Sequence, residues 1–168
     1  MGYETEFYGQ LKFDRPPDPA HKQYLNDFFR SRRMMRCATK TSNLADPVRE
    51  AVKLPVGNHG CYYVGSANND FGQDHDDSVL DHNRPPKGQP SLWCNMYITD
   101  TYIGFSSGKF YNYLDWLSYV IEKFIKPWGY KLNGEIEWTG EDRSDMGKIT
   151  VKDNVVSVSR AKVVWEND

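Results

Sequence analysis

Residues 110–129 read FYNYLDWLSYVIEKFIKPWG, and this stretch decides the fold of the chain. Its large apolar side chains recur at steps of three and one, the period of one face of an α-helix. They are Tyr113, Trp116, Leu117, Val120, Ile121, Phe124 and Ile125. Asn112 is a favourable N-cap with Asp115 at capping-box spacing, and Pro127 with Gly129 ends the helix. We interpret the stripe as a packing surface rather than a cofactor site.

Alternating segments on both sides of this helix predict a sheet. Residues 3–13 alternate as a half-buried strand, in which Gly9 marks a bulge or a close backbone approach. Residues 91–98 and 101–105 form a predicted hairpin, and three strands between residues 130 and 165 form a predicted meander. Asp18 and Pro19 begin a helix that runs to about Met35.

This order of elements predicts one α+β domain over residues 1–168. We expect a mainly antiparallel sheet of five or six strands, with two main helices packed on one face. Residues 37–90 interrupt the pattern as a long loop-rich insertion, with a short helix after Pro47 and a short strand around Tyr62. Loops longer than about 12–15 residues are usually functional or disordered, and we expect this one to carry the function.

Composition excludes several classes of protein. The net charge of −2 argues against a general nucleic-acid binder, which carries a basic excess. No apolar run approaches the roughly 18 residues of a membrane span. The three cysteines form no CxxC pair, which indicates free thiols in a reducing, cytoplasmic setting. They are Cys37, Cys61 and Cys94.

Several stretches of the chain resemble a family of small uncharacterised proteins from bacteria and their phages. These stretches are RRMMR, FGQD, DHNRPPKGQPSLWC, KFYNYLDWLSYVIEKFIKPWGYKLNGEIEWTGED and KDNVV. The resemblance covers most of the chain and is weakest around residues 41–59. It implies a bacterial or phage-infected cytosol, and it brings no known activity and no catalytic residue.

A basic run follows the first predicted helix. Residues 21–40 contain six Lys or Arg and one Asp, a local charge of six minus one, or +5. Arg32, Arg33 and Arg36 belong to this run, and planar guanidinium forks suit phosphate or carboxylate recognition. The alternative is structural, because cations near a helix C-terminus complement its dipole and stay solvated.

An acidic run lies inside the loop-rich insertion. Asp74, Asp76 and Asp77 flank His75, and carboxylate oxygens in this density can hold Mg²⁺ or Ca²⁺. The run lacks the order of an EF-hand loop, so solvated or N-capping aspartates are the alternative. If a metal does bind, the same residues predict a metal-dependent phosphoester or nucleotide hydrolase.

The segment DHNRPPKGQPSLWC, residues 81–94, is the other candidate site. Its prolines stiffen an extended path that holds Asn83, Arg84 and Gln89 near Trp93. A rigid aromatic with polar and cationic neighbours suits a nucleobase or the side chain of a partner. The alternative is that the prolines only shape a loop and Trp93 fills a gap on the sheet.

These patterns favour a non-enzymatic binding protein over an enzyme, and we assign no catalytic residue. The predicted ligand is either an anionic, nucleotide-like small molecule or a protein partner, and the resemblance adds a hypothetical role in phage–host conflict. No cofactor is required. Tyr8, Trp93 and Tyr97 are expected on the second face of the sheet, where a homodimer could form.

Overall fold

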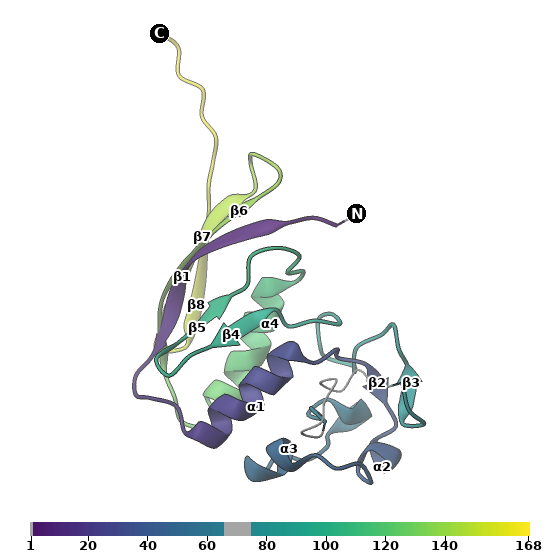
Figure 1. Ribbon diagram of the computed structural model, residues 1–168. Coiled ribbons are helices and arrows are strands. Elements are labelled where there is room, and N and C mark those ends of the chain that lie inside the picture. The colour runs from purple at the N-terminus through teal and green to yellow at the C-terminus, as the bar shows by residue number, and fades with distance from the viewer. Residues whose placement is uncertain (1, 66–74) are drawn as a thin grey trace.

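The computed structural model describes residues 2–65 and 75–168 and shows an α+β fold (Figure 1). One antiparallel sheet has the strand order β4-β5-β1-β6-β7-β8. Its strands are β1 (Thr5–Phe13), β4 (Met96–Ile98), β5 (Tyr102–Phe105), β6 (Leu132–Gly140), β7 (Met146–Lys152) and β8 (Val155–Arg160). Helices α1 (Pro19–Arg30) and α4 (Tyr113–Val120) cover one face. The predicted fold class, hairpin and meander are confirmed.

Strand β1 lies in the middle of the sheet and pairs with β6 along its whole length. Gly9 faces Ile136 in this ladder and has φ 110°, a region that side chains rarely adopt. A Cβ atom at Gly9 would lie 2.2 Å from the carbonyl oxygen of Glu135. The predicted close backbone approach at Gly9 is therefore confirmed, and it lets the two central strands pair without a gap.

The apolar stripe of residues 113–125 packs as predicted. Trp116, Leu117, Phe124 and Ile125 are fully buried, and α4 continues into the π-helical turn η2 (Ile121–Ile125). The predicted capping box is wrong. Asn112 has φ 59° at the N-cap position, and its side-chain amide donates to the carbonyl oxygen of Pro90, 3.1 Å away, rather than capping the helix.

Helix α1 begins as predicted and ends five residues early. The Asp18 carboxylate caps it by accepting from the Ala20 amide at 2.9 Å. Ser31 then takes an extended conformation, and its hydroxyl donates to the carbonyl oxygen of Asp27 at 2.6 Å. Arg32, Arg33 and Arg36 of the basic run therefore do not lie on a helix. Because the chain after Ser31 is extended, successive arginines point in different directions.

The loop-rich insertion is built from short elements beside the sheet (Figure 1). They are α2 (Ala38–Thr41), α3 (Pro47–Ala51), the 3-10 turn η1 (Asn58–Gly60) and β3 (Val79–Asp81), which pairs with β2 (Met35–Arg36) just before the insertion. The short helix after Pro47 is confirmed. The expected strand around Tyr62 is wrong, because Tyr62 lies in a turn. Its backbone amide donates to the carbonyl oxygen of Val56. Among residues 2–65 and 75–168, no helix combines the length and apolar character needed to cross a bilayer.

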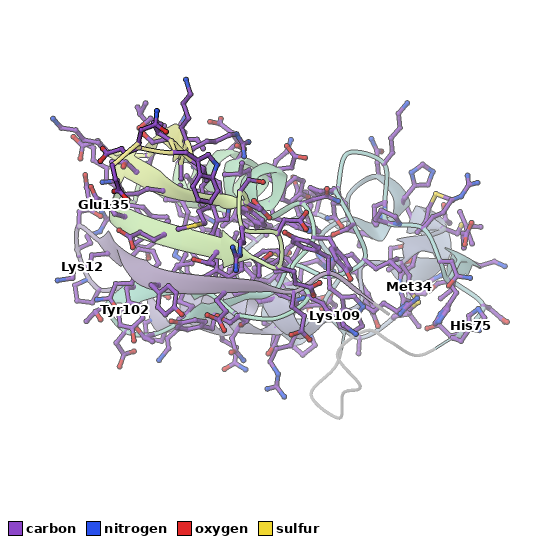
Figure 2. The ribbon with its side chains drawn as sticks, turned by 90° about the horizontal axis from the view of Figure 1, so that it is seen from above. Lys12, Met34, His75, Tyr102, Lys109 and Glu135 are labelled. Carbon is purple, nitrogen blue, oxygen red and sulfur yellow. The ribbon has the colours of Figure 1, made fainter. Side chains whose placement is uncertain are left out.

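The second face of the sheet is open and mostly polar. Figure 2 labels Lys12, Tyr102 and Glu135 on the strands. Tyr8 and Tyr97 are exposed to 57% and 40%, as predicted for this face. Trp93 is not part of it, because β4 begins only at Met96 and Trp93 belongs to the segment before the strand.

Candidate functional site

A groove of about 710 Å³ opens where the sheet meets the loop-rich insertion. Its lining comes from the proline-rich segment and from the residues just before α4. The lining residues are Asn83, Pro85, Ser91, Leu92, Trp93, Asn95, Lys109 and Tyr111. Figure 2 labels Lys109 between the sheet and the part of the molecule that carries Met34 and His75. We call this cavity the Trp93 groove.

The wall of the groove formed by the proline-rich segment is held to the core by two side chains, Trp116 of α4 and its N-cap residue Asn112. Trp116, which is fully buried, donates its indole N–H to the hydroxyl of Ser91 at 2.8 Å. The Asn112 amide holds the carbonyl of Pro90, as described above. The Asn95 amide donates to the carbonyl of Lys109 at 2.9 Å and ties the two walls together. These hydrogen bonds hold both walls of the groove in place, and small-molecule sites are usually preformed in this way.

Arg32 lies beside the groove and faces Trp93. Its Cζ atom is 5.9 Å from the centroid of the Trp93 ring, within the range of a cation–π contact. Its Nε donates to the carbonyl of His82 at 3.1 Å, and its Nη2 donates to the Asn83 side-chain oxygen at 3.3 Å. Three of the predicted site residues, Arg32, Asn83 and Trp93, therefore meet at one place.

Arg33 lies in the interior, 2% exposed. Its Nη1 donates to the carbonyl of Tyr63 and its Nη2 to that of Cys61, each at 2.8 Å. Burial lowers the pKa of this guanidinium. An exposed anion cannot reach Arg33, so the predicted ligand contact of Arg33 is replaced by a structural role.

Gln89 is buried beside Arg33 and completes this node. Its amide nitrogen donates to the carbonyl of Cys61 at 2.7 Å and to the hydroxyl of Tyr119 at 2.9 Å. Its side-chain oxygen lies 3.4 Å from the Nε of Arg33. Gln89 therefore joins the proline-rich segment to α4, and it does not face the groove.

Arg36 is also 2% exposed and binds within the protein. Its Nη1 lies 3.1 Å from the Asp76 carboxylate and 2.7 Å from the Ser78 hydroxyl, and its Cζ lies 4.5 Å from the Tyr63 ring centroid. Burial alone would raise the pKa of Asp76, but hydrogen bonds from Ser78 and Arg36 lower it. The predicted contact of Arg36 with a ligand thus gives way to a second structural node.

Arg84 is the most exposed of the four arginines predicted to bind a ligand. Its side chain is 77% exposed, and its Nε lies 3.5 Å from the Asp81 carboxylate. It does not line the Trp93 groove, although Asn83 and Pro85 on either side of it do. Of the predicted ligand-binding arginines Arg32, Arg33, Arg36 and Arg84, Arg32 alone therefore lies beside the Trp93 groove.

The predicted metal residues are only partly described. Asp74 lies outside the described residues, Asp77 is exposed, and Asp76 binds Arg36. Within residues 2–65 and 75–168, no three His, Cys, Asp or Glu side chains gather into a group suited to a metal ion. The Mg²⁺ or Ca²⁺ site at Asp74, Asp76 and Asp77 stays a prediction.

Three residues of the groove were missed by the sequence reasoning: Asn95, which follows the proline-rich segment directly, and Lys109 and Tyr111. Lys109 and Tyr111 lie on the turn before α4, and both are exposed, Tyr111 to 47%. No motif marks them. The only signal is that Tyr111 precedes the apolar stripe and does not belong to it, which is typical of an aromatic that contacts something other than the core.

Comparison with protein-family models, with curated proteins and with solved structures found no match.

Proposed function

We propose that this chain is a non-enzymatic binding protein whose Trp93 groove takes an anionic, nucleotide-like small molecule. The observation that carries the proposal is the contact of Arg32 with Trp93 at the side of an apolar groove of about 710 Å³. Small-molecule sites typically measure about 300–1,000 Å³ and combine apolar walls with a few polar groups. The groove has both properties.

The walls suit a planar ring. Trp93 is half-buried, and Leu92 and Pro85 add rigid apolar surface beside it. Stacking of a base on an aromatic side chain contributes about 1–3 kcal/mol. Tyr111 at the other wall offers a second ring with a hydroxyl group, so a base in the groove meets aromatic surface on more than one side.

The charge at the groove suits an anion. The Lys109 ammonium has no ion-pair partner among the described residues, and the Arg32 guanidinium lies against Trp93. A phosphate on a stacked nucleoside could accept from both cations while its base stays on the indole. Asn83 and Asn95 add amide groups able to recognise the edge of a base.

The setting and the alternative are also proposals. The resemblance suggests a bacterial or phage-infected cytosol and a role in phage–host conflict. A metal-dependent hydrolase built on Asp74, Asp76 and Asp77 has no specific contact in its favour among the described residues, because Asp76 is already bound by Arg36 and Ser78. We therefore propose no second function.

Thermal unfolding in the presence of AMP, adenosine or inorganic phosphate tests the ligand class. Ligand at about 100 times its Kd stabilises by about 2.7 kcal/mol, which raises the Tm of a domain of this size by about 5–10 °C. We expect a shift of this size with AMP, a smaller one with adenosine and almost none with phosphate.

Two lysine variants sharpen the test. Lys109→Ala should reduce the AMP shift and leave the adenosine shift unchanged, whereas Lys152→Ala, an exposed lysine outside the groove, should change neither. Equal shifts in Lys109→Ala and in the unmodified protein would contradict the proposed phosphate contact. The absence of a shift with both AMP and adenosine would contradict the ligand class.

A further inference from the structure

The two edges of the main sheet differ in length and exposure. Strand β4, at one edge, has only three residues, and Met96 and Ile98 in it are buried. Strand β8, at the other edge, has six residues, and all except Val156 are exposed. Natural proteins usually keep edge strands short, charged or covered, since an open edge invites another strand. Of the two edges, β8 is the open one.

The backbone of β8 has one side without a partner strand. Ala161 donates to the carbonyl of Met146, so the odd-numbered residues of β8 point their backbone groups at β7. The amides and carbonyls of Val156, Val158 and Arg160 consequently point away from the sheet. No strand pairs with them among residues 2–65 and 75–168.

Apolar side chains continue along this edge and beyond it. Val155 is 68% exposed and Val158 is 40% exposed. The chain then leaves the sheet as an extended tail (Figure 1), in which Val163, Val164 and Trp165 are exposed to 55%, 70% and 87%. A run of exposed apolar residues on an open strand edge is a typical surface for strand addition.

We propose that β8 pairs antiparallel with β8 of a second copy of this chain, forming a continuous twelve-stranded sheet from two six-stranded ones. A two-fold axis at Val158 sets this valine opposite its own copy and pairs the outward backbone groups of Val156 with those of Arg160. The interface is separate from the Trp93 groove and does not depend on the proposed ligand.

Charge supports this register. With Val158 on the axis, Lys162 lies opposite Asn154 of the second copy and next to its Asp153. Moving the axis to Val156 would set Arg160 opposite Lys152, and moving it to Arg160 would set two Arg160 side chains opposite each other. Like charges directly opposed across a strand pair are destabilising, so these two registers are disfavoured.

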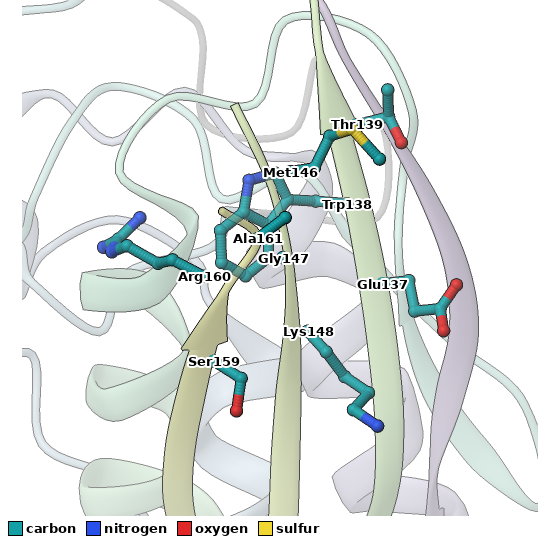
Figure 3. Close-up of a pocket in the computed structure, with 9 residues that line it drawn as sticks. All are labelled: Glu137, Trp138, Thr139, Met146, Gly147, Lys148, Ser159, Arg160 and Ala161. Carbon is teal, nitrogen blue, oxygen red and sulfur yellow. The ribbon is translucent and has the colours of Figure 1, made fainter. Parts of the chain in front are cut away.

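Shape supports the same register. A hollow of about 340 Å³ lies at the end of β7 and β8, lined in part by Gly147, Ser159 and Ala161 (Figure 3). In the Val158-centred arrangement, Val155 of the second copy lies opposite Ala161, beside this hollow. Val155, the most exposed valine of the strand, would then be covered. The C-terminal tail of each copy would run past the Asp153–Asn154 turn of the other copy.

Sedimentation velocity of the full chain at about 1–100 µM tests the interface, because this range spans weak to moderate dimers. The unmodified protein should rise from 19.5 kDa towards twice that mass. Val158→Pro removes only an outward amide and Val158→Lys adds charge at the axis, and both should stay at 19.5 kDa throughout. Leu80→Lys, which changes a 57% exposed leucine away from β8, should dimerise like the unmodified protein.

The register has its own variant. Lys162→Glu should weaken the dimer roughly tenfold, since the contact occurs twice, and adding Asp153→Lys should restore it. Circular dichroism confirms that each variant is folded. An unmodified protein of 19.5 kDa at every concentration overturns the proposal, and so does a dimer that neither Val158 variant weakens.

Discussion

The guanidinium of Arg33 lies over the ring of Phe28, with 4.3 Å between Cζ and the ring centroid. Phe28 belongs to α1, whereas the carbonyls that accept from Arg33 belong to Cys61 and Tyr63 in the loop-rich insertion. A single buried cation thus fastens the irregular part of the chain to the helical layer. Arg33 stabilises the fold that shapes the Trp93 groove, and its guanidinium is buried against protein partners.

Replacing Arg33 by Lys should cost about 2–4 kcal/mol of unfolding free energy, because an ammonium cannot reach the separate acceptors of a planar fork. Urea unfolding measures the loss. Arg143→Lys, at an exposed position in the β6–β7 turn, is the matched control and should change stability by less than about 0.5 kcal/mol. Equal stability of the two variants would show that the Arg33 node is unimportant.

Asp76 should stabilise the protein in a pH-dependent way. Its pKa is lower in the folded protein than its ordinary value of about 3.9. A lowered carboxyl pKa favours the folded state above that ordinary value, and the gain is lost as the pH falls through the folded-state pKa. Asp76→Asn should therefore cost about 1–3 kcal/mol at neutral pH, and this cost should shrink as the pH falls below the ordinary carboxyl pKa.

Unfolding of Asp76→Asn and the unmodified protein at several pH values measures this difference. Asp77→Asn, at an exposed neighbouring position, serves as the control and should change the unfolding free energy at neutral pH by less than about 0.5 kcal/mol. A difference for Asp76→Asn that stays constant between about pH 7 and pH 3 would contradict the ion pair with Arg36.

Gly9→Ala should destabilise the sheet by about 2–4 kcal/mol, because the new methyl group meets the carbonyl oxygen of Glu135 at 2.2 Å. Gly88→Ala is a matched control, since Gly88 also has a positive φ, 95°, but has no atom within 4 Å of the added Cβ. It should lose only about 1 kcal/mol, the strain of the backbone conformation. Thermal or urea unfolding measures both losses of stability. Equal losses in Gly9→Ala and Gly88→Ala would contradict the close backbone approach at Gly9.

The thiols of Cys94 and Cys37 should differ in reactivity. Cys94 is fully buried, and burial holds the pKa of its thiol well above the ordinary value. Cys37 is half-buried, and its segment lies at the surface cavity that Leu80 and Lys87 also line. In iodoacetamide labelling followed by mass spectrometry, Cys94 should react at least about 100-fold more slowly than Cys37 until urea unfolds the chain. Similar rates in the native protein would show that the core opens readily.

The sequence predicted the sheet and its helices well because their signals are local. The apolar stripe from Tyr113 to Ile125 and the alternation in residues 3–13 each report burial of one face. The capping of α1 by Asp18 was equally readable. The end of α1 was not, because the extended conformation of Ser31 depends on where Arg33 and Met34 pack.

The site was harder to predict because its parts meet only in three dimensions. Arg32 and Arg33 are adjacent in the sequence and look alike as charges, yet one faces Trp93 and the other fills the core. Their different roles depend on the distant carbonyls of Cys61, Tyr63 and His82. Lys109 joins the groove through the packing of the sheet against α4, which no spacing in the sequence encodes.

The central claim is that Trp93 forms the stacking surface of an anion-binding groove, and calorimetric titration with AMP tests it most directly. Trp93→Ala should weaken AMP binding at least tenfold, since stacking contributes about 1–3 kcal/mol. Trp165→Ala removes an 87% exposed tryptophan outside the groove and should leave the affinity unchanged. AMP binding of equal strength in Trp93→Ala and Trp165→Ala would contradict the account. So would a failure of the unmodified protein to bind AMP.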